Sequence, residues 1–135
     1  PEESNQVTLD PELTDSDGIP SPKITYRYSE NSLKMVAHGL ARAEEALRAA
    51  GAVEVTSAGP LADTGWHLLG TARMGNDPAT SVVNSWGRSH DVKNLFIIDG
   101  SIFVTSGGVN PASTIQALAL YIADTMKKNL TNLFD

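Results

Sequence analysis

The chain has 135 residues, of which 41% are hydrophobic, which is enough for about one domain with a buried core. Its formal charge of −6 argues against a nucleic-acid-binding surface, because such surfaces concentrate Lys and Arg. The absence of cysteine excludes disulfides, thiolate zinc sites and cysteine nucleophiles, and leaves cytoplasm and periplasm both open. No apolar run approaches the ~20 residues that cross a bilayer, and the N-terminal sequence lacks the regions of a signal peptide. We expect a soluble piece of a longer protein.

The first 22 residues hold four of the seven prolines and the turn-forming sequence TDSDG, which predicts a loop with at most one short strand over residues 6–9. In residues 23–29, apolar and polar side chains alternate, which predicts a half-buried strand. A helix is expected next, capped by Ser29 or Asn31 and ended by Gly51. Its apolar positions recur every three or four residues, at Leu33, Val36, Leu40, Ala43 and Leu47.

The centre of the chain is rich in loop-forming residues. Residues 52–57 predict a short strand, and residues 70–75 and 81–84 are the extended pieces expected within the loop-rich region 58–94. The apolar run 94–99 ends at Gly100, which favours a buried parallel strand followed by a ligand-binding loop.

A second helix is expected near the C-terminus. Asn110 as N-cap and Pro111 at the first helical position predict its start, and Lys127 and Lys128 suit its last turn. Its apolar stripe consists of Ile115, Leu118, Ala119, Ile122 and Met126. The segment 130–135 is expected to fray.

Three histidines raise the question of a metal site. His38, His67 and His90 lack the close spacing of paired ligands, so a metal site is disfavoured. His38 is expected to be a structural histidine on a helix and His90 a turn residue. On its own evidence, His67 is more simply a packed histidine than a reagent.

The segment SGGVNP could belong to two further classes of site, a serine-hydrolase nucleophile or a phosphate-binding loop. A nucleophile elbow needs a glycine two residues before Ser106, where Val104 stands, so a serine hydrolase is not supported. Neither phosphate-binding glycine fingerprint is present in the chain. The helix start at Asn110 and Pro111 could stabilise a group that becomes anionic, although an ordinary capped helix explains these residues as well.

The ordered motifs His-x-x-Gly-Thr-x-Arg-Met-Gly, Asp-Pro, Val-Val, Asn-Leu, Asp-Gly-Ser and Asn-Pro-x-x-Thr resemble the C-terminal signature of the glucose–methanol–choline (GMC) family of flavin-dependent oxidoreductases. The resemblance covers nearly the whole chain. It implies an α+β fold, in which residues 1–90 supply antiparallel substrate-domain strands with a packed helix. Residues 91–135 would supply the last strand and helix of the FAD domain.

The resemblance also implies functional residues. His67 matches the family's catalytic base, and Asn110 matches a second catalytic position that is His or Asn in the family. Asp99 and Gly100 match a segment whose backbone lies against FAD, and Asn110 and Pro111 match the stretch facing the flavin ring. These assignments suit oxidation of an alcohol or sugar hydroxyl to a carbonyl, because imidazole can accept the hydroxyl proton near neutral pH.

The chain lacks the family's dinucleotide-binding fingerprint, so we expect it not to hold FAD tightly or turn over alone. The implied partners are an FAD-binding N-terminal region or chain and a small alcohol or sugar. The edge of strand 94–99, without its sheet, could also support a homo-oligomer. The alternative function is a non-catalytic domain that acts by association with another chain. Substrate identity and the choice between oxidase and dehydrogenase stay open.

Overall fold

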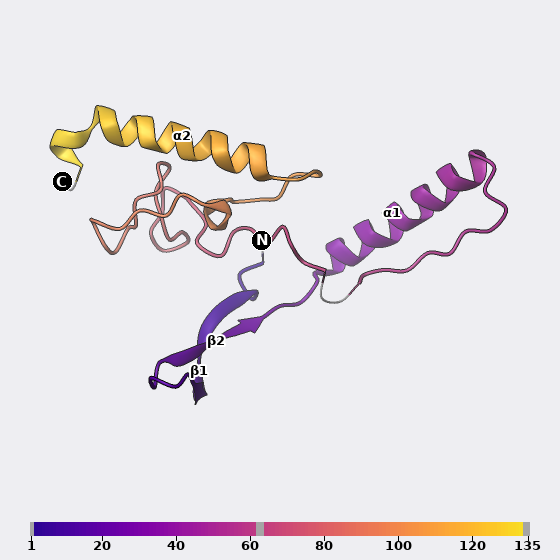
Figure 1. Ribbon diagram of the computed structural model, residues 1–135, viewed down its shortest axis with the longest axis horizontal. Helices are drawn as coiled ribbons and strands as arrows, with labels where there is room; N and C mark the ends of the chain where they lie inside the picture. The colour runs from indigo at the N-terminus through magenta and orange to yellow at the C-terminus, as the bar shows by residue number, and fades with distance from the viewer. Residues whose placement is uncertain (1, 62–63, 134–135) are drawn as a thin grey trace. The chain divides into compact units, whose positions relative to one another are not determined.

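The computed structural model describes residues 2–61 and 64–133, and the chain divides into two compact units, residues 2–65 and 66–135. The first unit contains strands β1 (Gln6–Thr14) and β2 (Pro20–Thr25) and helix α1 (Glu30–Ala49), and the second contains helix α2 (Ala112–Lys128) (Figure 1). Antiparallel strands and helices together confirm the α+β class predicted from the sequence. The expected division at residue 90, between a substrate-side part and a flavin-side part, stays a prediction.

The N-terminal segment forms a hairpin, so the prediction of a loop with at most one short strand is wrong there. β1, Gln6–Thr14, pairs antiparallel with β2, Pro20–Thr25, with Gln6 opposite Thr25 and a register shift after Leu9. The Asp10 carboxylate accepts the backbone N–H groups of Glu12 and Leu13, both at 2.9 Å. The hairpin accommodates its prolines because they lie at this irregularity or on strands with an unpaired edge.

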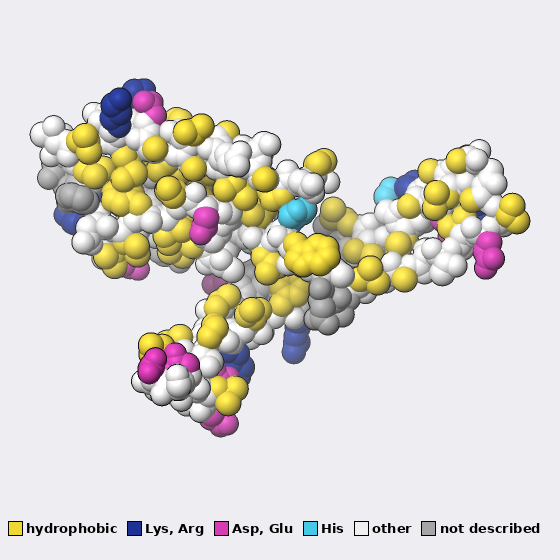
Figure 2. All heavy atoms as spheres, in the orientation of Figure 1, with side chains coloured by type: hydrophobic (Ala, Val, Ile, Leu, Met, Phe, Trp, Pro, Cys, Tyr) yellow, Lys and Arg dark blue, Asp and Glu magenta, His cyan; other side chains and the backbone are white. Residues whose placement is uncertain are grey.

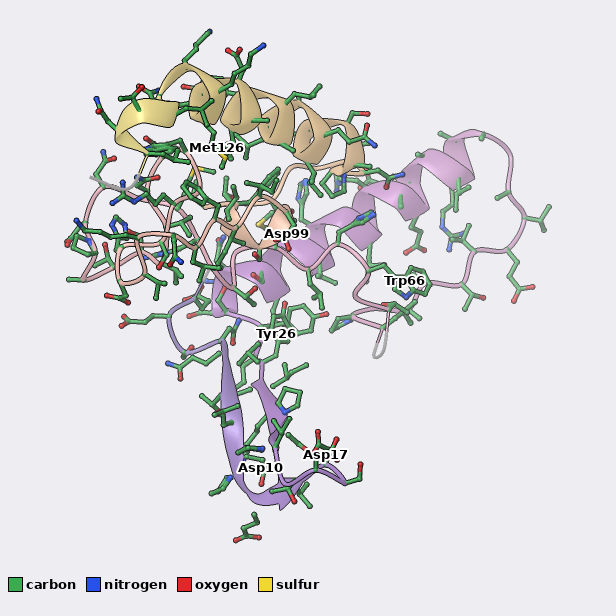
Figure 3. The ribbon with its side chains drawn as sticks, turned by 60° about the vertical axis from the view of Figure 1, so that its left-hand side comes forward. Asp10, Asp17, Tyr26, Trp66, Asp99 and Met126 are labelled. Atoms are coloured by element: carbon green, nitrogen blue, oxygen red, sulfur yellow. The ribbon has the colours of Figure 1, made fainter. Side chains whose placement is uncertain are left out.

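The turn of the hairpin is built by an aspartate. The Asp15 carboxylate accepts N–H groups of Asp17 at 2.9 Å and Ile19 at 3.0 Å, and Gly18 has a φ of +82°. Figure 3 labels Asp10 and Asp17 toward this end of the hairpin. The sequence TDSDG thus forms a turn, as its composition indicates.

The predicted strand over residues 23–29 is only partly present. β2 ends at Thr25, and Ile24 is 71% exposed, so the expected half-burial is wrong. Tyr26 and Tyr28 follow the strand and contact each other edge to face, with ring centroids 5.3 Å apart. The alternating residues Ile24, Tyr26 and Tyr28 lie on a surface that no other part of the described chain covers.

Helix α1, Glu30–Ala49, begins and ends where the sequence predicts. Ser29 Oγ accepts the N–H of Ser32 at 3.2 Å. At the C-terminus, Gly51 adopts a φ of +96°, and the N–H of Ala52 reaches back to the carbonyl of Leu47 at 3.0 Å. This arrangement is a Schellman motif, for which glycine is favoured because it adopts positive φ without strain.

No residue of α1 is buried, although its predicted stripe is present. The side chains of Val36 and Leu40 occupy the space beside Gly59, so the segment after α1 returns along the helix (Figure 1). The strand predicted over residues 52–57 is wrong, because this returning segment has no strand to pair with among the described residues. Hydrophobic side chains remain exposed over this unit (Figure 2).

The second unit has a small core beneath one helix. Val83, Ile102 and Ile122 are completely buried, the last of these on α2, Ala112–Lys128. Partly buried side chains surround them: Met74, Trp86, Ile97, Phe103, Leu118 and Met126. Met126 is labelled in Figure 3 on the side of α2 that faces the irregular segment. The predicted stripe of α2 therefore contributes Leu118, Ile122 and Met126 to this unit's core.

The predicted extended pieces 70–75 and 81–84 lie side by side. Met74 and Val83 form a bridge, and the N–H of Val82 donates to the carbonyl of Arg73 at 3.0 Å. Segment 94–99, in contrast, forms no strand of a sheet, so the predicted parallel strand is wrong for this chain. Its backbone pairs with a neighbouring loop instead, since the N–H of Ile97 donates to the carbonyl of Gly87 at 2.8 Å.

The start of α2 differs from the prediction, and its end agrees with it. Pro111 is the N-cap, no side chain caps the helix, and Asn110 lies one residue outside, so the prediction of Asn110 as N-cap is wrong. Lys127 and Lys128 occupy the last turn as predicted. None of the helices in the described ranges is long and apolar enough to cross a membrane.

The C-terminal segment does not fray over residues 130–133. A short 3₁₀ turn, Leu130–Asn132, returns the chain toward the unit's core, and Leu133 is 7% exposed. The Arg88 guanidinium donates to the Leu133 carbonyl at 3.0 Å. Residues 134–135 lie outside the described residues.

Candidate active site

A cavity of about 130 Å³ lies in the second unit, between the start of the unit and the segment that leads into α2. His67 and Leu69 contribute one side of its lining, and residues 106–111 contribute the rest. Two of the sequence-predicted site residues, His67 and Asn110, thus line the same cavity, and Pro111 joins them.

The segment that carries His67 is anchored by backbone hydrogen bonds. The N–H groups of Gly70, Ala72 and Met74 donate to the carbonyls of residues 100, 101 and 102 at 3.4, 2.9 and 2.8 Å. His67 lies three residues before the first of these bonds and is itself exposed, next to Trp66, which is 85% exposed. The anchoring fixes the course of the backbone while the imidazole stays accessible.

The opposite side of the cavity is a glycine-containing loop. Ser106 Oγ donates to the carbonyl of Gly107 at 3.0 Å. A side chain at Gly108 would meet nothing within 4 Å, so the backbone here is open to an approaching group. Asn110 and Pro111 then lead directly into α2, whose first turn has no side-chain cap. Uncapped N–H groups and the helix dipole give this end of the lining a partial positive charge.

Asp99 and Gly100 do not line the cavity, although Gly100 packs against Leu69, which does. The hydroxyl of Ser101 and its backbone N–H, at 2.8 Å, both donate to the Asp99 carboxylate. These bonds lower the pKa of Asp99 below its usual range. Figure 3 labels Asp99 at this turn, which begins the 3₁₀ helix Gly100–Ile102.

Gly100 is the point where three parts of the unit meet. A Cβ atom there would lie 2.6 Å from Leu69 Cδ2 and 3.2 Å from Ile115 Cδ1. The segment of His67, the Asp99 turn and the first turns of α2 therefore pack at one glycine. A side chain at position 100 would push Leu69, which lines the cavity.

The other two histidines lie outside the cavity lining. His38 is exposed on α1. His90 Nε2 is 2.9 Å from Ser81 Oγ, whose single hydrogen is donated to the carbonyl of Asp77 at 2.6 Å. His90 Nε2 must therefore be the donor to Ser81, which makes it a structural histidine. In the part of the chain that the structure describes, no group of three acidic or histidine side chains could hold a metal ion.

Sequence reasoning did not assign three side chains of the lining: Leu69, Ser106 and Val109. The sequence presents Ser106 as a possible nucleophile, and the absence of a nucleophile elbow argues against that role. Leu69 could have been found from its place two residues after His67, because alternate residues of an extended segment share a face. No local signal distinguishes Val109.

A model of the GMC oxidoreductase family matches residues 1–119, which is most of the chain. The chain is 46% identical over 136 positions to 2-methyl-1,2-propanediol dehydrogenase of Mycolicibacterium austroafricanum, covering 100% of this chain and 25% of that protein. It is 40% identical over 131 positions to 6'''-hydroxyparomomycin C oxidase of Streptomyces lividus, covering 96% of this chain and 24% of that protein.

The fructose dehydrogenase large subunit of Gluconobacter japonicus is 35% identical over 130 positions, covering 96% of this chain and 24% of the subunit. The chain thus spans about a quarter of the length of the curated relatives it matches. The names of these relatives describe oxidoreductases of a diol, of 6'''-hydroxyparomomycin C and of fructose. The chain belongs to the GMC family of oxidoreductases, as the family's C-terminal region.

Proposed function

We propose that this chain is the catalytic C-terminal part of an FAD-dependent oxidoreductase that oxidises an alcohol or sugar hydroxyl to a carbonyl. The observation that supports it best is that His67 and Asn110, which match the family's two catalytic positions, line one cavity. The names of the relatives, a diol dehydrogenase, an aminoglycoside oxidase and a fructose dehydrogenase subunit, support the same substrate range.

Two features of the cavity lining would suit a bound flavin ring. The open backbone at Gly108 allows a flat ring to approach closely. The uncapped start of α2 at Pro111 would stabilise negative charge on the pyrimidine side of a reduced ring. Bound FAD would accept the hydride from the substrate carbon. The main FAD-binding region is expected outside this chain, in an N-terminal partner region.

His67 is assigned the role of general base. An alcohol can lose a hydride from carbon only if its hydroxyl proton also leaves, and a neutral imidazole at the cavity can accept that proton. The exposure of His67 leaves its ring free to turn toward a bound hydroxyl. General bases of this kind contribute about 10² to 10⁴ in rate.

Asn110 is assigned the role of holding the substrate oxygen. Its amide can donate a hydrogen bond to that oxygen without competing for the proton that His67 removes. The amide is neutral throughout, so it contributes orientation and modest charge stabilisation. We expect its loss to cost less than the loss of the base.

The first unit suggests a role in association. Val7, Leu9 and Leu13 on the hairpin are 51%, 68% and 64% exposed, and Met35 on α1 is 66% exposed. Exposed apolar clusters of this extent favour burial against another part of a protein. The partner we propose is the N-terminal region of the same enzyme. The second candidate function is a non-catalytic domain that uses these surfaces to bind another chain or a second copy of itself.

The test is rapid-reaction measurement of flavin reduction in the complete enzyme carrying His67→Ala. The variant should retain flavin and reduce it about 10²-fold or more slowly than the parent enzyme. Reduction at the parent rate would exclude His67 as the base. A complete enzyme that binds flavin but shows no reduction with any alcohol or sugar would favour the non-catalytic candidate.

A further inference from the structure

The side chains that line the cavity include one hydroxyl that the proposed chemistry does not use. His67 and Asn110 are assigned to the reacting oxygen, and Leu69, Val109 and Pro111 offer only apolar side chains. Ser106 is the one remaining lining side chain that can form hydrogen bonds, within the residues that the structure describes.

The Ser106 hydroxyl is arranged to accept rather than to donate. Its hydrogen is directed to the carbonyl of Gly107 at 3.0 Å, which leaves the oxygen lone pairs available. Ser106 is also exposed, so a ligand can reach it without the chain moving. A group that meets Ser106 in the cavity should therefore be a hydrogen-bond donor, such as a second hydroxyl.

The size of the cavity limits where that second hydroxyl can be. The cavity measures about 130 Å³, and Ser106 and Asn110 belong to the same short loop. Since His67, Asn110 and Ser106 line one cavity of this size, a substrate whose reacting oxygen lies between His67 and Asn110 meets Ser106 with a hydroxyl close to the reacting carbon. A vicinal diol, or the equivalent pair of hydroxyls on a sugar, has this arrangement.

We propose that Ser106 is a specificity-determining residue that accepts a hydrogen bond from a second, neighbouring substrate hydroxyl and so favours vicinal diols and polyols over simple alcohols. The proposal rests on the proposed function, because it takes the reacting oxygen to lie at His67 and Asn110. Loss of a single neutral hydrogen bond corresponds to a change of about two- to tenfold in affinity or kcat/KM.

The first experiment compares 1,2-propanediol with 1-propanol as substrates of the complete enzyme. Ser106→Ala should lower kcat/KM for the diol by about fivefold and leave that for the monoalcohol within about twofold. Thr105→Ala is the matched control, because it removes a neighbouring hydroxyl that does not line the cavity, and it should leave both values within about twofold. Equal losses for both substrates, or no loss for either, would overturn the proposal.

A binding experiment separates this proposal from the proposed function. 2,3-Dimethyl-2,3-butanediol and tert-butanol have no hydrogen on the hydroxyl-bearing carbon, so neither can be oxidised, and calorimetry measures their dissociation constants directly. The parent enzyme should bind the diol several-fold more tightly, and Ser106→Ala should remove most of that preference. Equal binding of both compounds by the parent enzyme would overturn the role of Ser106, whereas unchanged flavin reduction in His67→Ala would exclude His67 as the base.

Discussion

The backbone N–H of Ala72 donates to the carbonyl of Ser101 at 2.9 Å, which joins the segment that follows His67 to the turn that Asp99 begins. Bonds from Gly70 and Met74 flank it on either side. A base proposed to act beside a flavin and a turn proposed to contact that flavin are therefore held together by the backbone. Side chains in this region can be changed one at a time without removing the framework that positions them.

Val83 is predicted to be a major source of stability in the second unit. It is completely buried among Ile102 and Ile122, whereas its neighbour Val82 is 43% exposed. Val83→Ala should lower the free energy of unfolding by about 2 kcal/mol, because it leaves a cavity in a small core, and Val82→Ala should change it by less than about 0.5 kcal/mol. Urea unfolding followed by tryptophan fluorescence measures both. Equal effects of the two variants would contradict the assignment of the core.

Leu133 is predicted to fasten the C-terminal segment. It is 7% exposed, and the Arg88 guanidinium binds its carbonyl, whereas Leu130 is 65% exposed. Leu133→Ala should cost about 2 kcal/mol of unfolding free energy, and Leu130→Ala less than about 0.5 kcal/mol. The backbone bond survives in both variants, so the comparison isolates burial of the side chain. A fraying C-terminus would make both substitutions neutral.

The pKa of Asp99 is predicted to depend on Ser101. The serine hydroxyl and N–H donate to the carboxylate and lower the pKa of Asp99 below its ordinary value of 3.8. The resulting stability is fully present above pH 3.8 and is lost as the pH falls through the lowered pKa of the folded protein. Ser101→Ala removes the hydroxyl donor, so the pKa should rise toward 3.8. Carboxyl carbon NMR titration measures this, and an unchanged titration would show that the hydroxyl bond has no effect.

Asn110→Ala is predicted to retain flavin and to slow flavin reduction in the complete enzyme by about tenfold, less than His67→Ala. The variant removes one hydrogen-bond donor to the substrate oxygen but leaves the base in place. Asn129→Ala serves as a control, since Asn129 is an exposed amide at the other end of α2. It should reduce flavin at the parent rate. A loss from Asn110→Ala as large as that from His67→Ala would assign Asn110 a greater role than orientation.

Local signals in the sequence predicted much of the fold. The Ser29 cap and the Gly51 stop of α1 are confirmed, because capping depends only on neighbouring residues. The α+β class and the family are confirmed as well. The full extent of the N-terminal hairpin does not follow from its composition, because prolines ordinarily interrupt strands, whereas here Asp10 and Asp15 organise the backbone around them.

The pairing of segment 94–99 could not be predicted correctly from composition. An apolar run indicates burial but not the partner that buries it, and here the backbone of Ile97 pairs with Gly87. The cavity was predictable only through the family motifs that single out His67 and Asn110. The importance of Ser106 depends on which loops meet, and that is a property of the tertiary structure.

The central claim is that His67 and Asn110 act on the same substrate oxygen, and a double-mutant cycle on flavin reduction tests it most directly. The four proteins are the complete enzyme, His67→Ala, Asn110→Ala and the double variant, compared by stopped-flow under anaerobic conditions. Groups that act on one transition state have non-additive effects, so the account predicts a coupling free energy of about 1 kcal/mol or more. Effects that add to within about 0.3 kcal/mol would contradict it.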